Sequence, residues 1–182
     1  MPDQRMEQLV KWAQAHWPGQ PGAAIAARPI PADGSPRLFL RLAGPGGTLV
    51  AMSNPGNPPE NRAWLGFADH LGKAGLPVAK VLAHDLAHGL FLMEDLGRES
   101  LMHKALAAQG DPQALLALYR PAVALAARLH AQCTRGLDYS LCFDSESLSP
   151  QFLLEREAGY FLEEMVKGAL GLGPADLPHG LE

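Results

Sequence analysis

The 182-residue sequence has little of what marks several protein classes. It has only two cysteines, Cys133 and Cys142, whose spacing matches no zinc or redox motif, so two reduced thiols are expected. No apolar run approaches the length of a membrane span, and the polar N-terminus lacks a signal peptide's apolar stretch. Its 15 Lys and Arg against 19 Asp and Glu give no basic excess. These absences predict a soluble cytoplasmic protein without a membrane or nucleic-acid partner.

The chain does have enough apolar material for a core. At 47% hydrophobic residues it can fold without metal or disulfide support. A formal net charge of -4 and 19% charged residues are not those of a disordered chain. The length suits one domain, or a domain and a half.

The first part of the sequence is typical of an antiparallel sheet with an inserted helix. Short runs with β-type alternation are separated by turn sequences, so consecutive strands are expected to pair as a meander. Strands and helices do not alternate regularly, which argues against a doubly wound parallel sheet. The predicted strands cover residues 23–30, 37–42, 48–52, 78–83 and 89–94.

Helices are predicted where apolar residues recur every three or four positions. Asn57 marks a helix start as an N-cap, and the apolar side of this helix carries Trp64, Phe67 and Leu71. Beyond the last strand the pattern is helical only, and Pro121 is expected to kink its helix or mark its true start. The fold class is therefore α+β. The predicted helices cover residues 3–17, 58–74, 99–109, 112–132 and 150–167.

Four short motifs follow one another along the chain: Ala32-Asp33-Gly34-Ser35-Pro36-Arg37 with Arg41, Val81–Asp85 with Gly89–Gly97, Leu125–His130, and Phe143-Asp144 with Leu153–Glu157 and Tyr160-Phe161. Together they resemble the small lobe of the protein-kinase-like fold and the helices that follow it. Within that fold they are similar to the aminoglycoside phosphotransferase and choline kinase group. Most narrowly, the sequence resembles the anomeric sugar kinases that act on N-acetylmuramate and N-acetylglucosamine.

The resemblance implies a nucleotide-binding small lobe with its hinge at residues 1–96, the helical start of a substrate lobe at 97–168, and a linker or vector-derived tail at 169–182. It also implies ATP and Mg²⁺ as cofactors of a parent enzyme that phosphorylates a sugar or amino-sugar hydroxyl. The expected nucleotide contacts are Asp33, Gly34, Ser35, Arg37, Met52, Glu94, Asp95 and Leu96. The expected substrate contacts are Asp144, Glu155 and Glu157.

The residue types suit these roles, although each has an ordinary explanation. Gly34 lets a backbone approach phosphate closely and Arg37 offers positive charge, yet Asp-Gly is also typical of a simple hairpin turn. The backbone of residues 94–96 can present a carbonyl and an N–H to a base. The acidic residues can bind sugar hydroxyls or form a solvated helix face. Glu155 and Glu157, two positions apart, are not expected to share one face.

Two features depart from the wider family. Met52 stands where kinases usually carry the phosphate-binding lysine, and Arg37 is the expected substitute for that lysine. Glu60 is either the helix partner left without its lysine or a capping residue at the start of its helix. Met at this position favours the sugar-kinase branch. No asparagine follows Asn61, so His84-Asp85 cannot belong to a complete catalytic loop. Asp95-Leu96-Gly97 imitates the magnesium-binding motif of protein kinases, but it follows a strand pair directly, with no catalytic loop before it. The chain is therefore expected to be inactive alone, with no catalytic or metal-binding residue of its own.

Two other interpretations stay open: a complete, non-catalytic kinase-like module that binds nucleotide or regulates a partner, and an unrelated interaction domain. The truncated-enzyme interpretation predicts either an exposed apolar patch on the helices at 112–132 and 150–167 or self-association through them. The module interpretation predicts a closed core instead. The side chains that distinguish them are Leu118, Leu125, Leu129, Phe161, Leu162 and Met165.

Overall fold

The computed structural model describes residues 2–31, 35–145, 147–173 and 176, so the predicted loop residues Asp33 and Gly34 lie outside it. The chain divides into two compact units, Met1–Leu141 and Cys142–Glu182. The first unit holds both the predicted small lobe and the two helices after it. A lobe boundary after residue 96 stays a prediction.

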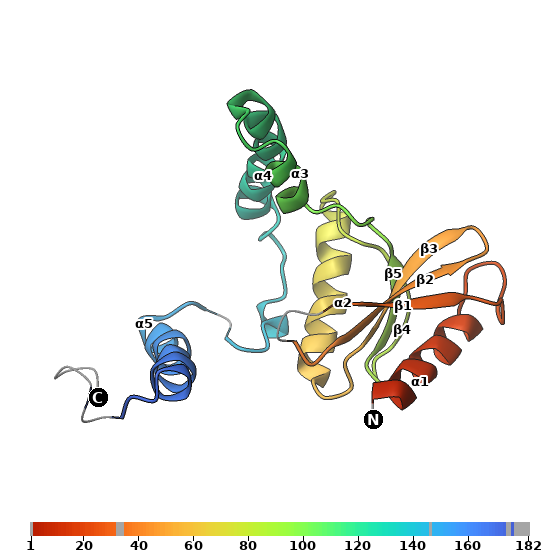
Figure 1. Cartoon of the computed structure of the whole chain (residues 1–182), viewed down its shortest axis with the longest axis horizontal. Helices are drawn as coiled ribbons and strands as arrows, with labels where there is room; N and C mark the ends of the chain where they lie inside the picture. The colour runs from red at the N-terminus through yellow and green to blue at the C-terminus, as the bar shows by residue number, and fades with distance from the viewer. Residues whose placement is uncertain (1, 32–34, 146, 174–175, 177–182) are drawn as a thin grey trace. The chain divides into compact units, whose positions relative to one another are not determined.

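Within the described residues, the first unit contains one antiparallel sheet with strand order β1-β2-β3-β5-β4. The expected five-stranded antiparallel sheet is thereby confirmed, with β5 inserted between β3 and the edge strand β4 (Figure 1). Pro29 lies in the other edge strand, where a missing N–H is tolerated. The strands are β1 (Ala26–Ile30), β2 (Leu38–Gly44), β3 (Gly47–Ser53), β4 (Val81–Asp85) and β5 (Leu90–Glu94).

The helices agree with the sequence pattern at most of their ends. The Asn57 side chain accepts a hydrogen bond from the Glu60 N–H and caps α2 as expected. Asp111 caps α4, which continues through Pro121, so Pro121 does not mark the helix start. The helices are α1 (Pro2–Ala15), α2 (Pro58–Lys73), α3 (Leu101–Ala107), α4 (Pro112–Gln132), a 3₁₀ turn (Tyr139–Leu141), and α5 (Pro150–Phe152), which continues as π-helix over Leu153–Ala158 and Phe161–Ala169.

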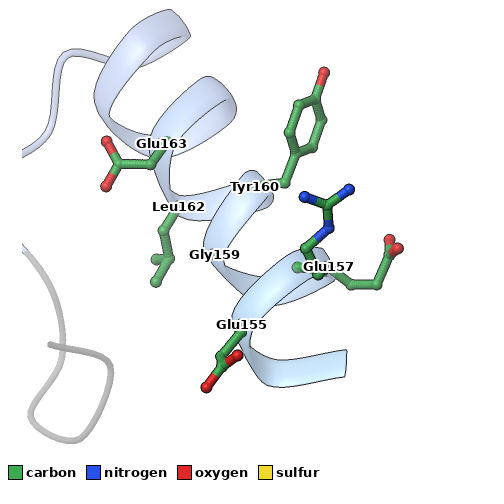
Figure 2. Close-up of a pocket in the computed structure, with 7 residues that line it drawn as sticks. Glu155, Glu157, Gly159, Tyr160, Leu162 and Glu163 are labelled. Atoms are coloured by element: carbon green, nitrogen blue, oxygen red, sulfur yellow. The ribbon is translucent and has the colours of Figure 1, made fainter. Parts of the chain in front are cut away.

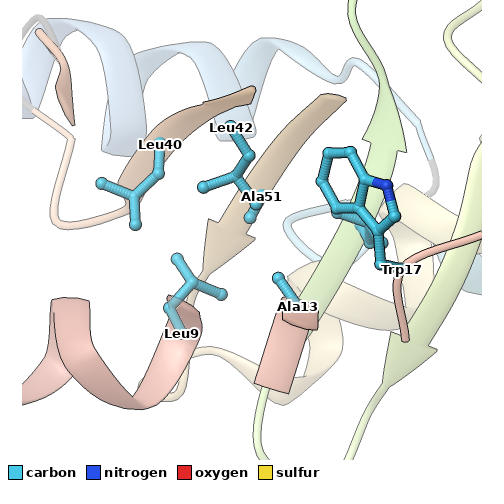
Figure 3. Close-up of a cluster of buried hydrophobic side chains, with 7 residues drawn as sticks. Leu9, Ala13, Trp17, Leu40, Leu42 and Ala51 are labelled. Carbon is cyan, nitrogen blue, oxygen red and sulfur yellow. The ribbon is translucent and has the colours of Figure 1, made fainter. Parts of the chain in front are cut away.

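Helices α1 and α2 cover opposite faces of the sheet, which Figure 1 shows. Alternate strand residues point to opposite faces, so each helix receives its own set of apolar side chains. On one face Leu9 and Ala13 of α1, with Trp17 just after the helix, are buried against the sheet (Figure 3). The sheet residues of this cluster are Leu40, Leu42, Ala51 and Leu92.

The α2 face is built around Met52, Phe91 and Met93, with Trp64 and Leu65 of α2 packed against them. Leu65, rather than the predicted Phe67 and Leu71, accompanies Trp64 there, which corrects that detail of the packing. The C-terminal half of α2 lies elsewhere: Leu71 lines a recess with Leu125 and Leu129 of α4, and His70 Nε2 lies 2.7 Å from the Cys133 carbonyl oxygen.

The predicted apolar exposure on α4 and the C-terminal helix is confirmed, because none of the six side chains is buried. Leu129, Met165 and Phe161 are 38%, 46% and 57% exposed. Leu118, Leu125 and Leu162 are half-buried. No helix among the described residues combines the length and apolarity that a membrane crossing needs.

The turn before β5 provides a test of this packing. Gly89 is buried with φ +63°, and a Cβ there would lie 2.3 Å from the Asn54 backbone oxygen. Gly46 has φ +82° with open space around it. Gly46→Ala should therefore lower the free energy of unfolding by about 1 kcal/mol, and Gly89→Ala by about 3 kcal/mol or more because a clash is added. Urea denaturation measures both, and equal losses would contradict the close approach.

Candidate nucleotide site

The sheet face that packs against α2 is organised in cross-strand rows. Directly opposed residues of antiparallel strands project to the same face of a sheet. The apolar residues of two such rows form a strip on this face. The strip ends at Met93, the residue just before the predicted hinge. The two rows are Phe39–Met52–Phe91 and Arg41–Val50–Met93.

Met52 belongs to the core of this face. Its side chain is 1% exposed and lies in a cluster with Phe91 and Met93. Met52 therefore brings no charge to the position where kinases usually have their lysine. Its contact with a nucleotide stays a prediction, and such a contact would be apolar.

The positive charge comes instead from Arg37, just before β2. Its Nη2 lies 2.7 Å from Glu60 Oε1, and its guanidinium carbon lies 5.9 Å from the centre of the Trp64 ring. Its backbone N–H donates to Ser35 Oγ at 3.3 Å, which ties the arginine to the end of the β1–β2 loop. Glu60 thus pairs with the arginine that the sequence suggested as a substitute cation.

A buried network of amides holds Glu60 in place. Asn54 Nδ2 donates to Glu60 Oε2 at 2.8 Å and to Asn61 Oδ1 at 3.1 Å. Asn61 Nδ2 donates to the Asn54 carbonyl at 2.7 Å, and the Asn54 N–H donates to the Gly89 carbonyl at 2.7 Å. Because both asparagines are buried and each is bonded more than once, the Glu60 carboxylate has a fixed position.

One donor of Arg37 is left without an acceptor. Among the described residues, Arg37 Nε is a buried side-chain nitrogen with no hydrogen-bond partner, while the side chain as a whole is 28% exposed. An unpaired buried donor costs free energy that an incoming acceptor recovers. A guanidinium also suits phosphate oxygens in both charge and geometry. The residues at this loop therefore fit a phosphate group.

The predicted hinge is attached to β2 by a second arginine. Arg41 Nε and Nη2 donate to the two carboxylate oxygens of Asp95 at 2.8 and 3.0 Å, and Nη2 also donates to the Gly97 carbonyl at 2.6 Å. The Arg41 hydrogen bond above all, with one from the Gly97 N–H, lowers the pKa of Asp95 to about 2, against the opposing effect of burial. The Asp95 carboxylate therefore has a structural partner.

The three predicted hinge residues differ in what their backbones offer. The Glu94 N–H already donates to the Lys80 carbonyl at 2.9 Å, and the Glu94 carboxylate accepts from the Lys80 N–H at 3.3 Å. Leu96 is 70% exposed, and in the described part of the chain no hydrogen bond uses its N–H. Leu96 thus offers an available backbone donor in the predicted hinge.

The predicted substrate contacts lie in the second unit and have partners of their own. Asp144 Oδ1 accepts from Arg156 Nη2 at 2.7 Å, and Glu155 accepts from the Gln151 side chain. Figure 2 shows Glu155 and Glu157 extending from different sides of the helix. The three carboxylates are not brought together, and their role as substrate contacts stays a prediction. Glu155 and Glu157, but not Asp144, line an open recess of about 680 Å³, together with Arg156, Gly159, Tyr160, Leu162 and Glu163.

Sequence reasoning missed the tether from α1 to this region. Arg5 Nε donates to Ser53 Oγ at 3.0 Å, Arg5 Nη1 donates to the Pro36 carbonyl at 2.9 Å, and Nη2 donates to the Ser53 carbonyl. Burial lowers the pKa of Arg5 from its ordinary value. Because the partners of Arg5 lie far along the chain, no local motif predicts this contact. The contact holds the start of β2 beside the end of β3.

The described residues do not offer a ligand set for a magnesium ion. Across residues 2–31, 35–145, 147–173 and 176, no three His, Cys, Asp or Glu side chains lie close enough to hold a metal ion. No step through Mg²⁺ is therefore derived from these residues.

The Arg41–Asp95 pair predicts a pH-dependent contribution to stability. A carboxyl whose pKa is lowered on folding stabilises the protein above its ordinary pKa, and this contribution is lost as the pH falls through the folded value. At neutral pH, Asp95→Asn should lower the free energy of unfolding by about 1–2 kcal/mol. The difference should shrink between about pH 4 and pH 2 as the wild-type carboxyl is protonated. Urea denaturation over this range is the measurement, and a constant difference would contradict the pair.

A comparison with curated proteins found a kinase that is similar to part of the chain. An N-acetylmuramate/N-acetylglucosamine kinase from Pseudomonas aeruginosa is 31% identical to the chain over 109 residues, which cover 55% of this chain and 32% of the kinase. The chain thus spans about a third of the length of this curated relative. No solved structure matches the chain.

A family profile matches much more of the sequence. The profile of the phosphotransferase enzyme family covers residues 26–168, which include the strands, the Arg37 loop, the hinge and the helices that follow. Because this match extends over most of the chain and agrees with its kinase-like sheet and helices, the chain belongs to the phosphotransferase enzyme family.

Proposed function

We propose that this chain is the nucleotide-binding part of an ATP-dependent phosphotransferase that acts on a hydroxyl group of a sugar or amino sugar. The observation that carries the proposal is the Arg37–Glu60 pair, whose buried Nε has no acceptor among the described residues. The pair combines the two charges that kinases usually provide from the third strand and its helix. The family match supports the reaction class.

Each part of the nucleotide has a candidate partner in the chain. Arg37 would donate to a phosphate oxygen while Glu60 holds its other nitrogen. The Leu96 N–H would donate to the edge of the base, beside the apolar strip that ends at Met93. When bound, ATP with Mg²⁺ supplies the phosphoryl group and its charge neutralisation. Ser35 and the neighbouring Asp33 and Gly34 stay proposed contacts.

The proposal of a sugar substrate rests on other observations. The matching kinase from Pseudomonas aeruginosa is named for N-acetylmuramate and N-acetylglucosamine, and the chain shares 31% of aligned residues with it. Carboxylates such as Asp144, Glu155 and Glu157 are suitable acceptors for sugar hydroxyls. A sugar or amino sugar is therefore the proposed acceptor.

We propose that the chain by itself does not transfer phosphate. The two aspartates in motifs that imitate catalytic loops are both engaged: Asp95 by Arg41, and Asp85 by the N–H and ring Nδ1 of His88 at 3.1 and 2.8 Å. The hydrogen bond from His88 lowers the pKa of Asp85. Neither carboxylate is placed to activate a hydroxyl group in this chain.

The exposed apolar side chains favour the interpretation that the chain is part of a larger assembly over the interpretation that it is a closed regulatory module. Leu129 in α4, with Leu116 and Val123 at 50% and 65% exposure, gives a surface suited to a protein contact. We propose self-association through α4 and the C-terminal helix when the chain is alone. A cytoplasmic location suits ATP as a substrate and the free thiols of Cys133 and Cys142.

Calorimetric titration tests the nucleotide proposal with a charge-removing variant. Arg37→Gln should weaken ATP binding about tenfold or more, because a charge-assisted hydrogen bond is lost. Adenosine has no phosphate, so its binding should be unchanged. Arg62→Gln is the matched control, since Arg62 is exposed on the same helix as Glu60. Equal ATP affinity in wild-type and Arg37→Gln proteins would remove the main support for the proposal.

A further inference from the structure

A charge conflict on the sheet directs attention to Arg41. In the β1–β2 register, Arg28 stands directly opposite Arg41. Like charges at directly opposed positions destabilise an antiparallel pair. Arg28 is exposed, whereas the Arg41 side chain is 20% exposed and needs a counter-charge. Asp95, from beyond the end of β5, supplies that charge with a carboxylate that is only 4% exposed.

The contacts of Arg41 and Asp95 enclose one short piece of backbone. Asp95 Oδ1 accepts from the Gly97 N–H at 2.9 Å, and Arg41 Nη2 donates to the Gly97 carbonyl at 2.6 Å. Both polar groups of Gly97 are thereby bonded, and its φ of +97° is one that side-chain-bearing residues rarely adopt. Leu96 lies between Asp95 and Gly97, so its backbone is held on both sides.

This fixed backbone borders the apolar strip of the sheet. Arg41 belongs to the same cross-strand row as Val50 and Met93, and Met93 leads directly into the hinge. Val50 is the partly exposed apolar residue of this row, and an apolar contact beside an available, oriented N–H is the combination that recognises a planar heteroaromatic base. The charge of Arg41 is already neutralised by Asp95, so Arg41 itself is not assigned to an anion.

We propose that Arg41 is a positioning residue, which acts through Asp95 and Gly97 to hold the Leu96 N–H in the orientation that binds the base of a purine nucleotide. The inference rests on the proposed nucleotide-binding function and divides the site into two parts. Arg37 sets affinity for the phosphates, whereas the Arg41–Asp95 pair sets affinity for the base.

Binding measurements with three ligands separate these parts. Adenosine reports on the base alone, tripolyphosphate on the phosphates alone, and ATP on both. Arg41→Met and Asp95→Asn should weaken adenosine and ATP binding by the same factor, about tenfold, and leave tripolyphosphate binding unchanged. Arg41→Lys should retain part of the affinity, because it keeps the charge but not the paired geometry. Arg28→Met, from the same row but without contact to Asp95, is the matched control.

Amide spectra of the wild-type chain and the milder variants Arg41→Lys and Asp95→Asn give a second readout that general instability would not produce. The Leu96 and Gly97 amide signals should shift on adenosine addition in the wild type, and shift less in both variants. Unchanged adenosine affinity in Asp95→Asn and Arg41→Lys, with lowered thermal stability only, would overturn the inference and leave a purely structural pair. A loss of tripolyphosphate binding in these variants that equals their loss of adenosine binding would overturn it too. A wild-type chain that binds none of the three ligands would instead refute the proposed function.

Discussion

The Glu60 carboxylate, in the first turn of α2, contacts Arg37 on one oxygen and Asn54 on the other. Its position depends on the Asn57 cap that starts the helix, and on the buried Asn54–Asn61 pair that joins the helix to the end of β3. Since the third strand offers only the buried Met52, this carboxylate decides where the positive charge of Arg37 is held at the start of β2. The proposed phosphate contact follows from that placement.

Strand β2 relates the two ends of the proposed nucleotide site. Arg37, Phe39 and Arg41 occupy alternate positions, so the strand periodicity of two puts Arg41 on the same face as Phe39 and carries Arg37 to the loop end of the strand. Each arginine has one acidic partner from a distant element: Glu60 for Arg37 and Asp95 for Arg41. Among the described residues Arg37 Nε has no acceptor, whereas Arg41 Nε and Nη2 are bonded to Asp95 and Gly97, and this difference assigns the two arginines to phosphate and base.

Local signals in the sequence were sufficient for most of the fold. Strand alternation, the Asn57 and Asp111 caps, and the apolar stripe of α1 predicted elements that the structure confirms. The pairs that build the site were beyond such reasoning, because Arg41 and Asp95 lie 54 positions apart, and Arg5 and Ser53 lie 48 apart. The tertiary fold brings them together, through the order of the strands and the packing of α1 on the sheet. The contact of Leu65, rather than Phe67, depends likewise on how α2 lies across the sheet.

A titration of the isotope-labelled chain with ATP, followed by amide spectra, tests the central claim most directly. The account predicts that the largest amide shifts occur at the residues around Arg37 and at Leu96 and Gly97. These two groups form the two ends of one saturable site. Shifts confined to another recess, such as the one of about 540 Å³ beside Lys73, Val78 and Lys80, would contradict it. So would an absence of saturable shifts at Arg37 and Leu96.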